Sequence, residues 1–157
     1  MKLKTLLTLE LADKITAEVF ALADKHKLHP LAVAVLDIGG NPIVIRRQDG
    51  TGILRTDIAI GKAWGSLGMG MASRTIRDRL ADRPNFQSGL AAASQGRFIP
   101  VPGGVLIYNE TGHAIGAVGI SGDASEKDEF CAIEAVKSAG LTPDPDQPHP
   151  DWKKAEL

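Results

Sequence analysis

The stretch LAVAVLDIGGNPIVIRR, residues 31–47, decides the fold that the sequence predicts. Residues 31–37 form an apolar run of strand length, and residues 43–47 form a second one. The residues between them, IGGNP, are rich in the glycine, asparagine and proline that tight turns require. This connection is too short for the crossover that joins parallel strands. The two strands are therefore predicted to form an antiparallel hairpin.

The second half of the chain repeats this pattern of short apolar runs and turns. Runs at residues 98–101, 105–109 and 114–120 predict three further strands. The turn-forming segments PGG, residues 102–104, and ETG, residues 110–112, separate them. Together with the hairpin, these runs predict a five-stranded, mostly antiparallel sheet.

Apolar residues at helical spacing predict helices before, between and after the strands. The first helix follows Thr8, a predicted N-cap, and the second covers about residues 56–71. Ser73 is predicted to cap a third, basic helix, and Ser125 opens a capping box for a last helix that ends at Gly140. This order lacks βαβ alternation, which favours an α+β fold, profilin-like or PAS-like, with helices flanking the sheet.

The second predicted helix is unusually rich in small residues. Between residues 59 and 68 it contains three glycines and two alanines, although each glycine costs about 1 kcal/mol of helix propensity. Such a composition is useful where another backbone must approach closely. The stretch is therefore predicted to pack tightly on the sheet or on another subunit.

The length of 157 residues fits one domain, which we assign to residues 1–141. Residues 142–157 form a proline-rich arm, and Trp152 is predicted to dock this arm on its own domain or on a neighbouring subunit. The 18 basic and 19 acidic residues nearly balance, which argues against nucleic acid or an anionic membrane as a partner. Cys131 is the single cysteine, so no internal disulfide is possible. We expect a cytoplasmic protein.

Five basic residues are candidates for binding an anionic ligand. Arg46 and Arg47 end a predicted strand, Lys62 lies in the glycine-rich helix, and Arg74 and Arg77 begin the next helix. Such side chains hold carboxylates or propionates through charge-assisted hydrogen bonds. The alternative is a solvated charged face, in which they pair with the nearby residues Asp49, Asp57 and Asp78. The sequence leaves both interpretations open.

His113 is the candidate metal ligand, because a lone histidine is a common partner of haem iron. It follows a predicted turn and begins a strand, which places it at an end of the sheet. His26 and His29 are weaker candidates near the end of the first helix. The alternative for all three is an ordinary exposed histidine.

Four blocks of the chain resemble, in order, the GlcG/HbpS-like family, which includes the C-terminal domain of PduO-type corrinoid adenosyltransferases. The blocks are residues 35–50 (VLDIGG and RQDG), 57–63 (DIAIGKA), 102–105 (PGGV) and 115–122 (IGAVGISG), the last followed by Asp128. The resemblance implies haem binding, haem degradation in some members, and assemblies from dimer to octamer. It also implies a link to glycolate or diol catabolism, and it adds Gly103 and Gly104 to the candidate cofactor-binding residues.

The chain departs from this family pattern at one position that matters for haem. PduO-like domains have a histidine just after the Lys-Ala helix, whereas residues 71–75 here read MASRT. We therefore expect a homo-oligomer that binds haem or a small anionic ligand without that histidine, with His113 as the substitute iron ligand. The alternatives are a small metabolic enzyme that acts on a carboxylate, with Lys62 or an arginine orienting the substrate, and a sensory module that acts through a protein partner.

Overall fold

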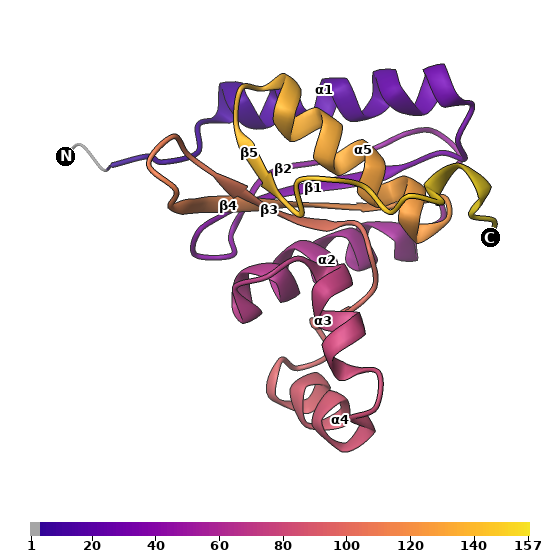
Figure 1. Ribbon diagram of the computed structural model, residues 1–157. Helices are drawn as coiled ribbons and strands as arrows, with labels where there is room; N and C mark the ends of the chain where they lie inside the picture. Colours follow the sequence, from indigo (N-terminus) through magenta and orange to yellow (C-terminus); the bar gives the residue numbers. More distant parts are fainter. Residues whose placement is uncertain (1–3) are drawn as a thin grey trace.

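The predicted hairpin is present in the computed structural model, which describes residues 4–157 (Figure 1). Strand β1 (Ala32–Asp37) pairs antiparallel with β2 (Pro42–Arg47). The Asp37 carboxylate fixes the turn, because its Oδ1 accepts hydrogen bonds from the backbone N–H groups of Gly39 and Asn41, both at 2.9 Å. The side chain thus satisfies turn donors that the short ladder leaves unpaired.

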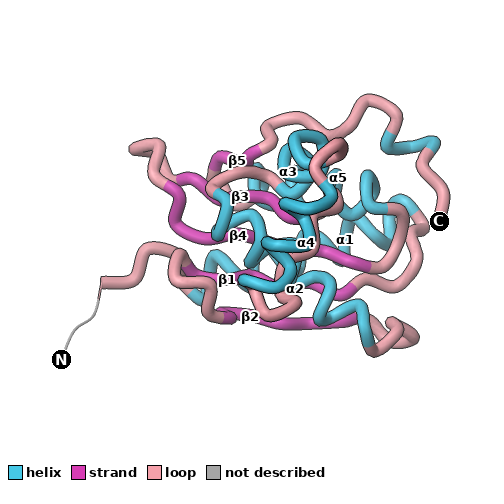
Figure 2. Tube along the Cα trace, turned by 90° about the horizontal axis from the view of Figure 1, so that it is seen from below, coloured by secondary structure: helices cyan, strands magenta, loops and turns pink. Residues whose placement is uncertain are grey.

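Three further strands complete the sheet: β3 (Gly104–Tyr108), β4 (Ala114–Ser121) and β5 (Thr142–Asp144). The strand order is β2-β1-β4-β3-β5, and every neighbouring pair is antiparallel. Figure 2 shows the same order from below. The predicted α+β class with a five-stranded antiparallel sheet is therefore confirmed.

One predicted strand is wrong. Residues 98–101 are irregular, because the side chain of Phe98 is buried in a small cluster with Ile76 and Leu80 beside the sheet. The fifth place in the sheet belongs to β5, at the start of the proline-rich arm. A proline is tolerated there because Pro143 lies on an edge strand, where a missing ladder donor costs little.

Helices cover both faces of the sheet (Figure 1). Helices α1 (Leu9–His26) and α5 (Ser125–Ser138) pack on one face, and α2 (Leu54–Met69) packs on the other. Helix α3 (Ser73–Leu80) follows α2, and α4 (Pro84–Ala93) lies farthest from the sheet and has no buried residue. Among the described residues, no helix is both long and apolar enough to span a membrane.

The predicted helix caps have mixed outcomes. Thr8 caps α1, because its hydroxyl accepts the backbone N–H of Leu11 at 3.2 Å. Ser73 does not cap α3; its hydroxyl instead accepts the backbone N–H of Gly104 at 2.8 Å and so ties the helix to β3. Ser125 does not cap α5 either, because the helix already includes it and Ala124 is the N-cap.

The prediction that the glycine-rich helix packs tightly is confirmed on the sheet. Ala59 and Ala63 of α2 are fully buried in the cluster on this face. A side chain at Gly119 of β4 would collide with the Ala59 carbonyl, so the close approach also depends on a glycine in the sheet. On another side of α2, a Cβ atom at Gly65 would lie 3.2 Å from the ring of Phe98.

Candidate functional site

A buried ion pair lies where α2 and α5 meet the end of β4. The Nζ of Lys62 is 2.9 Å from Oδ2 of Asp128 and donates a second hydrogen bond to the Ile120 carbonyl at 2.8 Å. The two side chains are only 2% and 1% exposed. Burial raises the pKa of Asp128 to about 6, although the neighbouring Lys62 ammonium opposes this shift.

Gly103 and Gly104 pass directly over this ion pair. Gly103 has φ +114°, and a Cβ atom there would lie 2.9 Å from the Lys62 Nζ. A Cβ atom at Gly104 would collide with the Lys62 backbone carbonyl. The structure therefore brings together Lys62, Gly103 and Gly104 from the predicted site. It also encloses the Lys62 ammonium completely, so a ligand carboxylate would have to displace Asp128 to reach it.

Asp123 supports the same region from the loop before α5. Its carboxylate accepts the backbone N–H groups of His29 at 2.8 Å and Ala124 at 2.7 Å, and it lies 3.2 Å from the Lys127 Nζ. Although burial opposes ionisation, these contacts hold the pKa of Asp123 below its ordinary value. No motif in the sequence singles out Asp123 as a site residue, whereas Asp128 follows the family-like block at residues 115–122.

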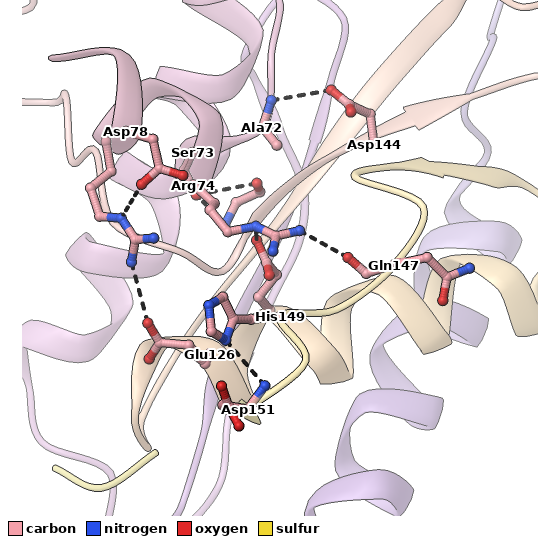
Figure 3. A network of polar contacts seen from close by, with 12 residues as sticks. Ala72, Ser73, Arg74, Asp78, Glu126, Asp144, Gln147, His149 and Asp151 are labelled. Carbon is pink, nitrogen blue, oxygen red and sulfur yellow. Dashed lines mark hydrogen bonds and ion pairs between the residues drawn. The ribbon is translucent and has the colours of Figure 1, made fainter. Parts of the chain in front are cut away.

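A second network joins α3, α5 and the C-terminal arm (Figure 3). The Nε of Arg74 is 3.2 Å from Oε1 of Glu129, and its Nη2 donates to the Gln147 carbonyl at 2.9 Å. The Glu129 side chain is 0% exposed, and neither of its oxygens accepts a well-formed hydrogen bond from the described residues. Burial raises the pKa of Glu129 to about 7, against the opposing effect of Arg74. No pattern in the sequence marked Glu129.

Arg47 and His113 lie apart from these two networks. Arg47 is exposed on the outer strand β2, donates to the Thr51 carbonyl at 3.0 Å, and lines an open hollow of about 560 Å³. His113 is exposed in the turn between β3 and β4, with its Nδ1 2.9 Å from the Thr111 hydroxyl. The predicted site residues therefore occupy separate parts of the molecule. Lys62 and Arg74 do not pair with the aspartates of the predicted charged face but bind Asp128 and Glu129 instead, whereas Arg77 does pair with Asp78 at 2.8 Å.

Two hollows have mainly apolar walls. One, of about 160 Å³, lies between α2 and α4 and is lined by Trp64, Met69, Leu90 and Phe98 among others. The guanidinium of Arg97 lies 4.3 Å from the centre of the Trp64 ring. The other, of about 360 Å³, lies beside the start of the chain and is lined mostly by leucine and isoleucine.

The apolar walls of these hollows suit the porphyrin ring of haem, but they offer no histidine as a ligand for its iron. Small-molecule sites usually enclose roughly 300–1,000 Å³, so the hollow beside Trp64 is small for haem unless α4 moves. No histidine lines either hollow. Among residues 4–157, no group of three or more histidine, cysteine and acidic side chains is placed to hold a metal ion. Apolar contact is therefore available within one chain, whereas neither hollow offers a histidine to the iron.

Comparison with protein families gives one match over most of the chain. A model described as haem-degrading, HbpS-like protein matches residues 7–137. An uncharacterised 15.0 kDa protein from the dhaT-dhaS intergenic region of Citrobacter freundii is 31% identical over 131 residues, which is 83% of this chain and 89% of that protein. The corrinoid adenosyltransferase PduO of Salmonella typhimurium is 28% identical over 71% of this chain, but the match spans only 33% of PduO.

Solved structures agree with this match. The protein ORFY of Klebsiella pneumoniae superposes with a TM-score of 0.79 at 28% identity, covering 89% of this chain and 94% of that one. A structure described as the PduOC:heme complex superposes with a TM-score of 0.77 at 25% identity, covering 86% and 96% of the two chains.

Proposed function

Because the chain belongs to the HbpS-like family of haem-degrading proteins, we propose that it is a haem-binding protein. One observation carries this proposal: a relative that matches 86% of this chain forms a complex with haem. Bound haem would supply the iron and oxygen chemistry for haem degradation. The position of the Citrobacter freundii relative between dhaT and dhaS supports a role beside small-molecule catabolism.

We assign the porphyrin contact to the hollow beside Trp64. Its walls offer an aromatic ring, a thioether from Met69 and Gly68 of α2, where no side chain of the helix stands between a flat ligand and the backbone. Arg97, which already lies over the Trp64 ring, is placed to bind a propionate at the rim. Helix α4 forms the opposite wall and has no buried residue, so its displacement would break few contacts.

A histidine for the iron is what the described residues of one chain do not supply at this hollow. His113 remains the proposed ligand, and its exposed position in the turn between β3 and β4 allows it to reach haem held against a second copy. Arg47 is the other exposed candidate for a propionate, because Lys62 and Arg74 already bind carboxylates of their own chain. This arrangement requires the homo-oligomer that the family resemblance implies.

Titration with haemin, followed by absorption spectroscopy, tests the proposal. We expect a shifted Soret band with the wild-type chain, a band of altered position or intensity with His113→Ala, and an unchanged band with His29→Ala. His29 is a suitable control because it is also exposed. A wild-type chain with no haemin-dependent Soret shift would contradict haem binding, whereas an unaltered band in His113→Ala would exclude only that ligand.

A further inference from the structure

The C-terminal arm folds back across its own domain after β5. Asp144 accepts the backbone N–H of Ala72 at 3.2 Å, and the Gln147 carbonyl accepts from Arg74 at 2.9 Å. Farther along, the ring of Trp152 stacks on Phe130 with a centroid distance of 3.6 Å. Figure 1 shows this segment, in yellow, running from β5 past α5 to the C-terminus. Beyond β5, which belongs to the sheet, the arm is therefore held at a few separate points rather than by a continuous ladder.

Beneath the arm lies a carboxylate that the closed structure satisfies poorly, with no well-formed hydrogen bond to either oxygen from the described residues. Glu129 is fully buried, and its one close cationic contact among the described residues is Arg74 at 3.2 Å. The same guanidinium holds the arm through Gln147. Leaving a buried polar group without hydrogen bonds is unfavourable, and more so for a charge. Water would satisfy both oxygens if the arm lifted.

The groups around Glu129 come from three elements (Figure 3). Helix α3 contributes the cations Arg74 and Arg77, α5 contributes Glu126, and the arm contributes His149 and Asp151. The Arg77 guanidinium is shared, because it lies 3.2 Å from Glu126 and 2.8 Å from Asp78. Burial, and to a smaller extent Glu126, oppose the ionised form of Glu129, whereas Arg74, the backbone N–H of His149 and Arg77 favour it.

We propose that residues 145–152 form a proton-controlled strap, which is docked while Glu129 is protonated and is released when Glu129 ionises. The inference rests on the enclosed, unsatisfied carboxylate and on the sparse attachment of the strap, and it does not depend on haem binding. The physical reason is that docking removes water from Glu129, and burial in the absence of water favours the neutral acid.

The direction of the pH effect follows from linkage. The docked state binds the Glu129 proton more tightly than an open state in which water reaches the group, so docking is favoured at low pH. It weakens as the pH rises through the docked-state pKa of about 7. If the open-state pKa returns to the ordinary 4.5, the opening equilibrium rises by up to about 300-fold once the pH is well above 7.

Fluorescence of Trp152 can follow the strap directly. The chain has two tryptophans, so Trp64→Phe leaves Trp152 as the sole reporter. In this background we expect quenching of Trp152 by acrylamide to rise between pH 5.5 and 8.5 with a midpoint near 7. With Glu129→Gln, which keeps the shape of the side chain without the charge, quenching should stay low at every pH. Circular dichroism checks that each variant is folded.

Two kinds of control separate Glu129 from its neighbours. Glu134→Gln changes a half-exposed carboxylate on the same helix and should keep the wild-type transition. His26→Gln and His149→Gln should keep it as well, although His26 packs edge-on against Trp152 at 5.3 Å. Loss of the transition in either histidine variant would overturn the proposal. High quenching at every pH in Glu129→Gln would also overturn it, because the ion pair with Arg74 would then be what holds the strap.

Discussion

Lys62 is the largest fully buried side chain among the described residues. Burying a charged lysine costs much free energy of desolvation. The folded state therefore depends on the two groups that accept hydrogen bonds from the Lys62 ammonium, the Asp128 carboxylate and the Ile120 carbonyl. Three of the four family-like blocks thus meet at one enclosed ion pair, through Lys62, Gly103–Gly104 and Ile120. We infer that this pair sets the geometry by which α2, α5 and the Gly-Gly entry to β3 meet.

Removal of one partner should therefore be severe. Lys62→Met leaves the Asp128 carboxylate buried and unpaired, and we expect a loss of about 3–5 kcal/mol in the free energy of unfolding by denaturant titration. Lys137→Met, which breaks a partly exposed pair with Glu134, should cost less than about 1 kcal/mol. The double variant Lys62→Met/Asp128→Leu should be more stable than Lys62→Met alone. A single variant as stable as the wild type would show that the pair is dispensable.

At the scale of elements, α2 is fixed by small residues on two of its sides. Ala59 and Ala63 contact the sheet, while Gly61 and Gly65 face the irregular segment that contains Phe98 and Ile99. Residues 98–101, which were predicted to form a strand, therefore pack against the side of α2 that carries Gly61 and Gly65. Their position explains why this helix carries glycines that helix propensity alone disfavours.

Gly65→Leu tests that contact. The added side chain would press on the Phe98 ring, and we expect the free energy of unfolding to fall by about 1–3 kcal/mol, seen as a lower melting temperature. Gly68→Ala is the matched control, because an added Cβ there meets only the edge of Trp64 at 3.8 Å and improves helix propensity. An unchanged melting temperature in Gly65→Leu would mean that the segment around Phe98 yields without cost.

An element could be predicted when local sequence signals determine it, and could not when it depends on contacts with distant parts of the chain. The hairpin at residues 31–47 was predictable because its turn chemistry and strand lengths are local. Strand β5 was not, because a three-residue strand with a central proline has no strand signal of its own and forms only on the edge that β3 provides. Helix α4 also went unpredicted, although Pro84 at its first turn is a usual helix start. The burial of Glu129 could not be predicted for a similar reason, because it depends on contacts with the C-terminal arm, which is distant in sequence.

In the whole molecule, the C-terminal arm packs against its own domain, whereas α4 remains largely exposed. Trp152 was predicted as an anchor, and it docks on its own domain against Phe130 and His26. Helix α4, in contrast, projects from the molecule with an apolar composition and no buried residue, and Phe86 is 45% exposed. Exposed apolar surface of this kind is typical of an interface.

We therefore predict a homo-oligomer whose contact includes α4. Light scattering at micromolar concentration should give a mass of at least twice 16.6 kDa for the intact chain. Phe86→Ser should shift the assembly towards the monomer. Ile53→Ser, which changes a side chain that is 88% exposed outside α4, should not. Truncation after Asp146, which keeps β5, should leave the assembly intact. A monomeric wild-type chain would contradict the prediction altogether.

The prolines of the two outer strands limit what kind of assembly is open to this protein. Pro42 lies in β2 and Pro143 in β5, and these strands form the two edges of the sheet. A proline lacks the N–H donor that an incoming strand would need, and Arg46 and Arg47 add charge along the β2 edge. Strand β5 is only three residues long with Pro143 at its centre, and the β2 edge begins at Pro42 and ends in two charged residues, so both edges are poor templates for a strand from another molecule. Joining of copies sheet to sheet into open-ended fibres is thereby disfavoured, which is consistent with the predicted contact through α4.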